Sequence, residues 1–289
     1  MGNQANTQIY QNGILLLQAQ AVDYTPYLAQ RLILLADSGA ALTADINTLM
    51  SYRNSDGGWG GYLNYGSANF HTSLALQALK AVNYSDTTVI SSALAYLAGT
   101  QNTDGGWGFY QGDDSNVYMT ALVLQTLSQF STTYNLSTAI NKAASYLIAN
   151  QNSDGGFGSP SSTVYETSHA YMALAGLITD NTVLGNAINY LSSTQAPNGS
   201  WNDDPYSTAL ALRALYLSEN KPTPPPSPTT GTVTGVVVEA STNQPLGGVS
   251  ISAVGGQLSA TTDNTGSFTL ANMPAGSQQI TLSLSGYAS

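Results

Sequence analysis

The chain has 289 residues, of which 42% are hydrophobic and only 8% charged, and its formal net charge is −10. Its 6 Lys and Arg residues are too few for the cationic clusters that nucleic acids and anionic membranes require, so neither is expected as a partner. The chain has no cysteine, which excludes disulfides, thiolate nucleophiles and cysteine-ligated metals.

The composition also bears on where the protein acts. Few charges, no cysteine and abundant Asn, Ser and Thr favour a bacterial protein that is secreted or displayed at the cell surface. No apolar run reaches the length of a membrane span, so membrane insertion is not expected. Residues 1–11 are polar and lack the basic and apolar regions of a signal peptide, so the signal of an exported protein would have been removed or would lie upstream.

Residues 1–220 alternate between two kinds of predicted helix. The first kind is amphipathic, in segments at residues 42–50, 89–97, 140–148 and 183–191. The second kind is apolar nearly all round and should be buried on most sides, in segments at residues 25–32, 72–79, 120–127, 167–174 and 208–215. If five such pairs curve, the second kind forms an inner ring. The sequence therefore predicts an all-α domain, an α/α toroid of five helical hairpins or an incomplete arc of one.

A glycine-rich stretch separates the two helices of a pair. Residues 101–108, Gln-Asn-Thr-Asp-Gly-Gly-Trp-Gly, recur with aspartates at intervals of 48 and 50 residues, and a degenerate copy stands at 195–201. A period of this length indicates a supersecondary unit stacked on copies of itself. Glycine suits the end of the preceding helix, where the chain often turns left-handed. The repeated positions with a predicted structural role are Asp56, Trp59, Gln101, Asp104, Trp107, Gln151, Asp154, Phe157 and Trp201.

This motif, followed by a Thr-Ala-x-x-Leu-x-x-Leu helix, resembles the prenyltransferase and squalene-oxidase (QW-type) repeat of terpenoid cyclase-like proteins. The resemblance covers residues 1–220 and implies an α/α barrel. It also implies that Gln101 and Gln151 tie neighbouring outer helices, while the aromatic residues of the motif pack over them. Arg53 stands where the first copy would have glutamine.

Residues 221–231 are Pro-rich and predict an extended linker between two domains. Beyond the linker an alternating apolar pattern predicts strands near residues 233–238, 249–254, 268–270 and 280–284. This pattern and its turns resemble the carboxypeptidase regulatory-like β-sandwich. The resemblance implies a small all-β module at residues 232–289, a non-catalytic spacer that is cut short of the family's further strand.

The resemblance offers three catalytic precedents, and the residues they need are missing from the matching positions. Class II terpene cyclases protonate their substrate with an Asp-rich motif at the start of an inner helix, where residues 116–121 of this chain contain no carboxylate. Protein prenyltransferases and thioester domains both need cysteine, which this chain lacks. Glu166 and Asp204 remain as candidate acids, but neither can form the cluster of three carboxylates that the motif provides. An enzyme is therefore not favoured, and no cofactor is expected.

An aromatic residue stands two positions before the Thr of each of four inner-helix segments. In a ring of inner helices these residues would meet at one mouth, beside helix N-termini with partial positive charge. The predicted binding residues are Phe70, His71, Tyr118, Tyr165, Glu166 and Tyr206, for a glycan, a peptide or an apolar small molecule. The structural alternative is that the aromatic residues close their hairpins and Glu166 caps its helix, with His71 and His169 as hydrogen-bonded rim and core residues.

Three functions remain open. The first is a non-catalytic binding or scaffolding module of a bacterial surface protein. The second is a terpene cyclase-like enzyme, related to squalene/hopene cyclases, that uses the toroid cavity. The third is a purely structural repeat segment of a longer surface protein. No metal site is expected, because there are only 2 histidines and because Asp104, Asp113 and Asp114 lack the spacing of a calcium loop.

Overall fold

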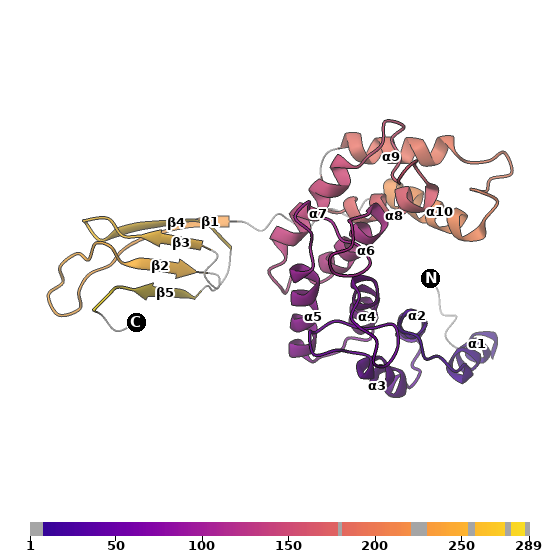
Figure 1. Cartoon of the computed structure of the whole chain (residues 1–289), viewed down its shortest axis with the longest axis horizontal. Coiled ribbons are helices and arrows are strands. Elements are labelled where there is room, and N and C mark those ends of the chain that lie inside the picture. Colours follow the sequence, from indigo (N-terminus) through magenta and orange to yellow (C-terminus); the bar gives the residue numbers. More distant parts are fainter. Residues whose placement is uncertain (1–7, 179–180, 221–229, 254–257, 275–278, 287–289) are drawn as a thin grey trace. The chain divides into compact units, whose positions relative to one another are not determined.

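The computed structural model describes residues 8–178, 181–220, 230–253, 258–274 and 279–286. The chain divides into two compact units, Met1–Thr223 and Pro224–Ser289, coloured indigo to orange and orange to yellow in Figure 1. The division falls within the segment predicted as a linker, of which residues 221–229 lie outside the described part of the chain. The predicted domain limits therefore stay a prediction, and the two units are described separately.

The described part of the first unit consists of helices joined by turns and loops, with isolated β-bridges near the glycine-rich motifs. Its helices are α1 (Gln8–Ala19), α2 (Thr25–Leu35), α3 (Thr43–Ser51), α4 (Asn69–Ala81), α5 (Thr87–Gly99), α6 (Val117–Ser128), α7 (Ser137–Ala149), α8 (Val164–Leu174), α9 (Asn181–Ser193) and α10 (Pro205–Glu219). In chain order outer and inner helices alternate, which gives the five predicted pairs from α1 and α2 to α9 and α10.

The inner helices pack in chain order, α2 on α4, then α6, α8 and α10. Outer helices α3, α5, α7 and α9 each pack on the inner helix beside them, and Figure 1 shows the resulting two-layered arc. One hydrophobic core runs through the unit from α2 to α10. The predicted all-α fold is thus confirmed, in the form of an arc.

The two sequence patterns correspond to two kinds of burial. Outer helix α5 buries one stripe, namely Val89, Ile90, Ala93, Leu94 and Leu97, the residues that its pattern placed on one face. Inner helix α6 buries nine of its twelve residues. An inner helix is enclosed because it touches an outer helix and both of its inner neighbours.

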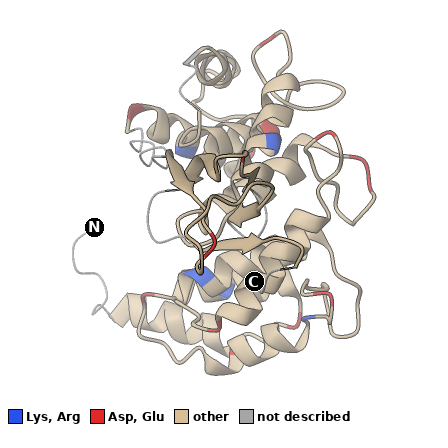
Figure 2. Cartoon of the chain, turned by 90° about the vertical axis from the view of Figure 1, so that its left-hand side faces the viewer, with Lys and Arg blue, Asp and Glu red and all other residues tan. Residues whose placement is uncertain are grey.

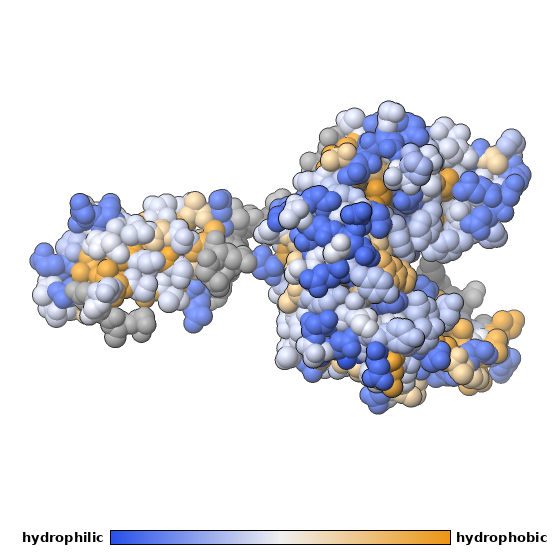
Figure 3. Space-filling view, viewed as in Figure 1, coloured by the Kyte–Doolittle hydropathy of each residue, from blue (hydrophilic) through white to orange (hydrophobic). Residues whose placement is uncertain are grey.

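The last inner helix, α10, lacks a following neighbour among the described helices. Leu76, Leu124 and Tyr171 stand four residues after the repeated Thr of α4, α6 and α8, and at most 1% of each is exposed. Leu212 is the same position in α10 and is 53% exposed. At the other end of the arc, α1 exposes Leu15 and Leu16, and Figure 3 shows apolar surface there.

Charged residues are sparse along the chain, as the colouring of the ribbon in Figure 2 shows. Arg31 of α2 and Asp45 of α3 form an ion pair at 2.6 Å, and the same guanidinium donates to the carbonyls of Leu17 and Gln20. These bonds hold the connection between α1 and α2 against the first hairpins. Among the described helices, none combines the length and the apolar character needed to cross a membrane.

The second unit consists of two antiparallel sheets. Strands β1 (Thr230–Val236) and β4 (Ser267–Pro274) pair in one sheet, and β3 (Leu258–Thr261), β2 (Ser250–Ala253) and β5 (Ile280–Ser283) form the other in that order. Ile251 and Ala253 of β2 share a core with Leu270 and Met273 of β4. The predicted β-sandwich is confirmed, although the sequence did not predict β3, which has only one large apolar residue.

Candidate ligand-binding site

The glycine-rich turns position the start of each inner helix through one repeated set of contacts. Asp104 Oδ1 accepts hydrogen bonds from the Gly106 N–H at 2.9 Å and from the Ser115 hydroxyl at 2.8 Å. Asp56 and Asp154 make the same contacts in their turns. In the fourth turn the amide oxygen of Asn198 accepts from the N–H and the hydroxyl of Ser200.

The motif tryptophans join the outer helix before the turn to the inner helix after it. Trp107 Nε1 donates to the Leu97 carbonyl of α5 at 2.8 Å, and its backbone N–H donates to the Thr120 hydroxyl of α6 at 3.1 Å. Trp59 and Trp201 repeat both bonds, and Phe157 keeps the backbone one. The repeated Thr, whose spacing was visible in the sequence, is therefore the acceptor that fixes the turn on the helix.

The motif glutamines lie as the resemblance implies. Gln101 Nε2 donates to the carbonyls of Gly105 and of Ala139, the latter in α7, at 2.9 Å each. Gln151 contacts α9 in the same way, through the Val183 carbonyl. Arg53 replaces this tie with a hydrogen bond to the Ser92 hydroxyl of α5, and its guanidinium lies 5.7 Å from the centroid of the Trp59 ring.

These turns bring four aromatic side chains into a continuous row, here called the aromatic row. Phe70, Tyr118, Tyr165 and Tyr206 are each the second residue of an inner helix. Successive ring centroids lie 6.4, 4.9 and 6.0 Å apart, within the range of aromatic contacts. The first three rings are half-buried and Tyr206 is 58% exposed.

The row continues from Phe70 through residues that the sequence analysis did not single out. Phe109 stacks on Phe70 at 5.2 Å and meets the edge of His71 at 5.4 Å. His71 in turn contacts Tyr24, which stacks on Tyr62 at 4.8 Å. Tyr24 precedes Thr25 as His71 precedes Thr72, so the repeat register was the signal that could have identified it.

Burial disfavours charge on three side chains of this surface, Tyr118, Tyr165 and His71. Burial raises the pKa of Tyr118 and of Tyr165, so both hydroxyls keep their protons. Burial lowers the pKa of His71 to about 4, and its Nε2 lies 3.3 Å from the Tyr24 hydroxyl. His71 is therefore a buried, hydrogen-bonded and uncharged member of the row.

His169 of α8 contacts two rings of the aromatic row. Its ring meets Tyr118 at 5.1 Å and Tyr165 at 4.8 Å, and neither of its ring nitrogens has a hydrogen-bond partner within the described residues. The expectation of a hydrogen-bonded core histidine is wrong in that respect. Burial, and to a lesser extent the Arg213 charge, lowers the pKa of His169 to about 4.

Both candidate acids lie at helix N-termini. Asp204 caps α10 by accepting the Ser207 N–H at 2.7 Å, and its hydrogen bonds to Ser207 lower its pKa, which disfavours a proton donor. Glu166 lies in the first turn of α8, where its Oε2 accepts from the Thr163 hydroxyl at 3.0 Å. Burial raises the pKa of Glu166, against the opposing effect of that hydrogen bond.

The position of the cyclase acid motif is occupied by an ordinary helix start. The amide oxygen of Asn116 caps α6 by accepting the Met119 N–H at 2.9 Å. Asp104 and Asp113 are both engaged by the protein, the latter through the Tyr110 N–H. In the described part of the chain no group of three or more His, Cys, Asp or Glu is placed to hold a metal ion.

Comparison with solved structures shows a terpene cyclase-like fold for the helical unit. Type II terpene cyclase MstE from Scytonema (apo) matches with a TM-score of 0.57 and 20% identity over 75% of this chain and 74% of its own. Against a complex of that cyclase with its product, the chain spans 65% of the relative's length, slightly less than two thirds.

Two further structures extend the comparison. The ent-copalyl diphosphate synthase from Streptomyces platensis matches with a TM-score of 0.56 and 20% identity over 71% of this chain and 45% of its own. Candida albicans protein geranylgeranyltransferase-I, complexed with GGPP, matches with a TM-score of 0.60 and 18% identity over 74% and 78%. Comparison with curated proteins gave no match.

Two family models match the chain. The CarboxypepD_reg-like domain matches residues 233–289, as the resemblance of the second unit implied. The squalene-hopene cyclase C-terminal domain matches residues 72–221, which is more than half of the chain and runs from the first turn of α4 to the end of α10. The chain therefore belongs to the squalene-hopene cyclase C-terminal domain family.

Proposed function

We propose that the helical unit binds an isoprenoid-type hydrocarbon chain along the aromatic row. The observation that carries this proposal is the continuity of the row, in which ring follows ring from Tyr24 to Tyr206 with part of the surface open. An extended apolar ligand needs a surface of this kind, whereas a compact polar ligand needs several convergent hydrogen-bonding groups.

The electrostatics of the row support the same ligand class. Protonated tyrosines and uncharged histidines present ring faces without a net charge. Ring faces carry partial negative charge, which suits the unsaturated carbons of an isoprenoid better than an anionic ligand. Two structural relatives are described with geranylgeranyl ligands, which lends support to the cyclase-related hypothesis over a scaffold without a small-molecule ligand.

Binding of geranylgeraniol to the full chain, measured by thermal shift and by calorimetry, tests the proposal. A ligand that binds the folded state raises its melting temperature by mass action. We expect Tyr118→Ala and Tyr165→Ala each to weaken binding about tenfold, since stacked aromatic contacts contribute on the order of 1 kcal/mol beyond their buried area. Tyr216→Ala is the matched control, because Tyr216 is 64% exposed on α10 outside the row. Absence of binding, or equal losses in all three variants, would overturn the proposal.

A second candidate function is proton-initiated cyclisation with Glu166 as the acid. The observation favouring it is the raised pKa of Glu166, because only a protonated carboxyl can donate to an alkene. Incubation with squalene and with geranylgeraniol, followed by mass spectrometry of the extracted products, tests it. A cyclised product that Glu166→Gln abolishes while binding persists would support the enzyme. Binding without any product would remove this candidate and leave the first.

A further inference from the structure

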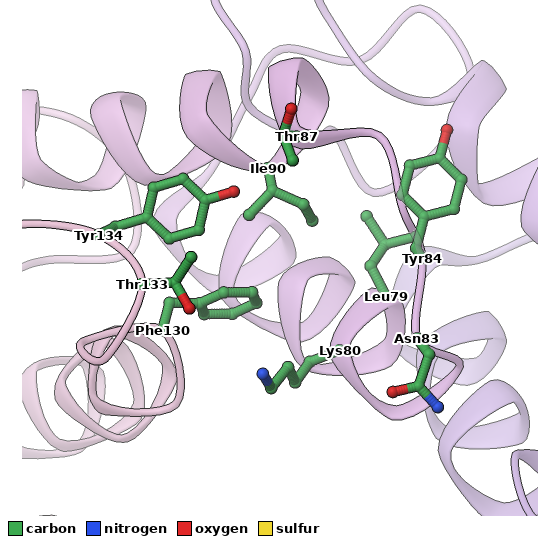
Figure 4. A pocket seen from close by; sticks show the side chains of 9 residues that line it. All are labelled: Leu79, Lys80, Asn83, Tyr84, Thr87, Ile90, Phe130, Thr133 and Tyr134. Atoms are coloured by element: carbon green, nitrogen blue, oxygen red, sulfur yellow. The ribbon is translucent and has the colours of Figure 1, made fainter.

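A pocket lies at the C-terminal ends of inner helices α4 and α6, whereas the aromatic row lies at their N-terminal ends. Its lining includes Leu79 and Lys80 in the last turn of α4, and Lys80 lies ten residues, or about 15 Å, along the helix from Phe70. The start of α5 and the loop after α6 complete it, and its volume is about 240 Å³ (Figure 4). No residue of the aromatic row contributes to its lining.

The inner surface of this pocket is apolar and aromatic. Leu79, Ile90 and Phe130 are buried and lie between the other lining residues in Figure 4. Tyr84 and Tyr134 stand on opposite sides of them. Phe130 and Tyr134 meet edge to face at 6.3 Å, which orients the Tyr134 ring.

Around this apolar surface stand polar groups that the protein does not use. The side chains of Asn83, Tyr84, Thr87, Thr133 and Tyr134 line the pocket, and within the described structure none makes a hydrogen bond to another protein group. Hydroxyl and amide groups both donate and accept, so they match a ligand that carries hydroxyls of its own.

The pocket also holds one of the 6 basic residues of a chain whose net charge is −10. Lys80 Nζ lies 5.5 Å from the centroid of the Phe130 ring and forms no ion pair with a carboxylate among the described residues. An ammonium group in this position is available for an anionic substituent of a ligand.

We propose that this pocket binds a single sugar residue that carries a carboxylate, that is, a uronic acid. The tyrosine and phenylalanine rings take the apolar face of the sugar ring, the five neutral polar side chains take its hydroxyls, and Lys80 takes the carboxylate. The volume is below the roughly 300–1,000 Å³ of sites for drug-sized ligands, which fits one ring rather than an enclosed oligosaccharide. The proposal is independent of isoprenoid binding, because the two sites share no residue.

Saturation-transfer NMR and calorimetry on the full chain test this proposal with methyl β-glucuronide and methyl β-glucoside as probes. We expect the glucuronide to bind in the millimolar range and the glucoside about five- to tenfold more weakly, on the order of 1 kcal/mol for an exposed charge pair. Lys80→Met should reduce glucuronide binding to the level of the glucoside. Tyr134→Ala should weaken both sugars, because it removes a ring that both contact.

The matched control is Lys142→Met, which makes the same change of charge on α7 outside the pocket. It should leave glucuronide binding unchanged, and circular dichroism should show the same helix content in every variant. Failure of both sugars to bind would overturn the proposal. It would also be overturned if Lys80→Met had no effect, or if Lys142→Met caused an equal loss.

Discussion

At the scale of single residues, Asp104 shows what the motif aspartate does. Its carboxylate accepts hydrogen bonds from the Gly106 N–H and the Ser115 hydroxyl. In the fourth turn the amide oxygen of Asn198 accepts the equivalent N–H, that of Ser200, together with the hydroxyl of the same serine. The contact with the N–H two residues on therefore needs an acceptor oxygen, which an amide supplies as a carboxylate does. This explains why an Asp-rich repeat can recur in a chain without catalytic acids at these positions.

We expect Asp104→Asn to change the free energy of unfolding by less than about 0.5 kcal/mol, because the amide oxygen can accept both bonds. Asp104→Ala should lower it by about 1–2 kcal/mol, since the buried Gly106 N–H loses its acceptor. Urea denaturation followed by circular dichroism measures both. A loss as large in the Asn variant as in the Ala variant would mean that the charge itself matters.

His169 is the second residue with a consequence that can be measured. It stands two residues after the repeated Thr, where α4, α6 and α10 have Leu74, Leu122 and Leu210. A leucine therefore fits this position of the fold, while the imidazole leaves two nitrogens buried without partners. The pH dependence of stability should reveal this histidine.

Burial lowers the pKa of His169 to about 4, so the unfolded chain, with a value near 6.5, binds the proton more tightly. His169 alone should then cost no stability above pH 6.5 and should lower the free energy of unfolding by up to about 3 kcal/mol as the pH drops to 4. His169→Leu should remove its share of that decrease, leaving the share of His71, which has the same sign. Urea denaturation at pH 7.5 and 4.5 tests this, and an unchanged decrease in the variant would contradict it.

At the scale of helices, the repeat provides its own control for packing. Leu124 in α6 and Leu212 in α10 occupy the same repeat position, and only Leu124 is covered by a following inner helix. Leu124→Ala should therefore cost about 2–5 kcal/mol, as deletions in a closed core do. Leu212→Ala should cost less than about 1 kcal/mol because its surface is already half in water. Equal costs in chemical denaturation would show that this face of α10 is covered in solution.

The helices of the first unit could be predicted from the sequence because their buried apolar residues recur with the period of an α-helix. The stripe of Val89, Ile90 and Leu94 and the all-round apolarity of α6 were both visible and both confirmed. Strand β3 was missed because its four residues include one large apolar side chain, which is too little for an alternating pattern.

The candidate site was less predictable, since it depends on how the hairpins curve. The register placed Phe70, Tyr118, Tyr165 and Tyr206 at one end of the inner helices, yet their contacts need the curvature of the arc. Contacts across long separations, such as Tyr24 with His71, leave no local pattern. The binding role of these residues remains a prediction, which the geranylgeraniol experiment addresses.

At the scale of the whole molecule, the two units have separate hydrophobic cores, one running from α2 to α10 and one between the two sheets. Separate cores should unfold separately, because cooperativity comes from shared packing. Scanning calorimetry of the full chain should resolve two transitions.

Deleting residues 224–289 should remove one of these transitions and leave the melting temperature of the other within about 2 °C, a shift corresponding to less than 1 kcal/mol. The deletion of residues 181–289, which cuts into the arc at α9, is the control and should lower the remaining transition, since it exposes the faces of α8 that α9 and α10 cover. A single transition that both deletions shift equally would mean that the β unit stabilises the arc.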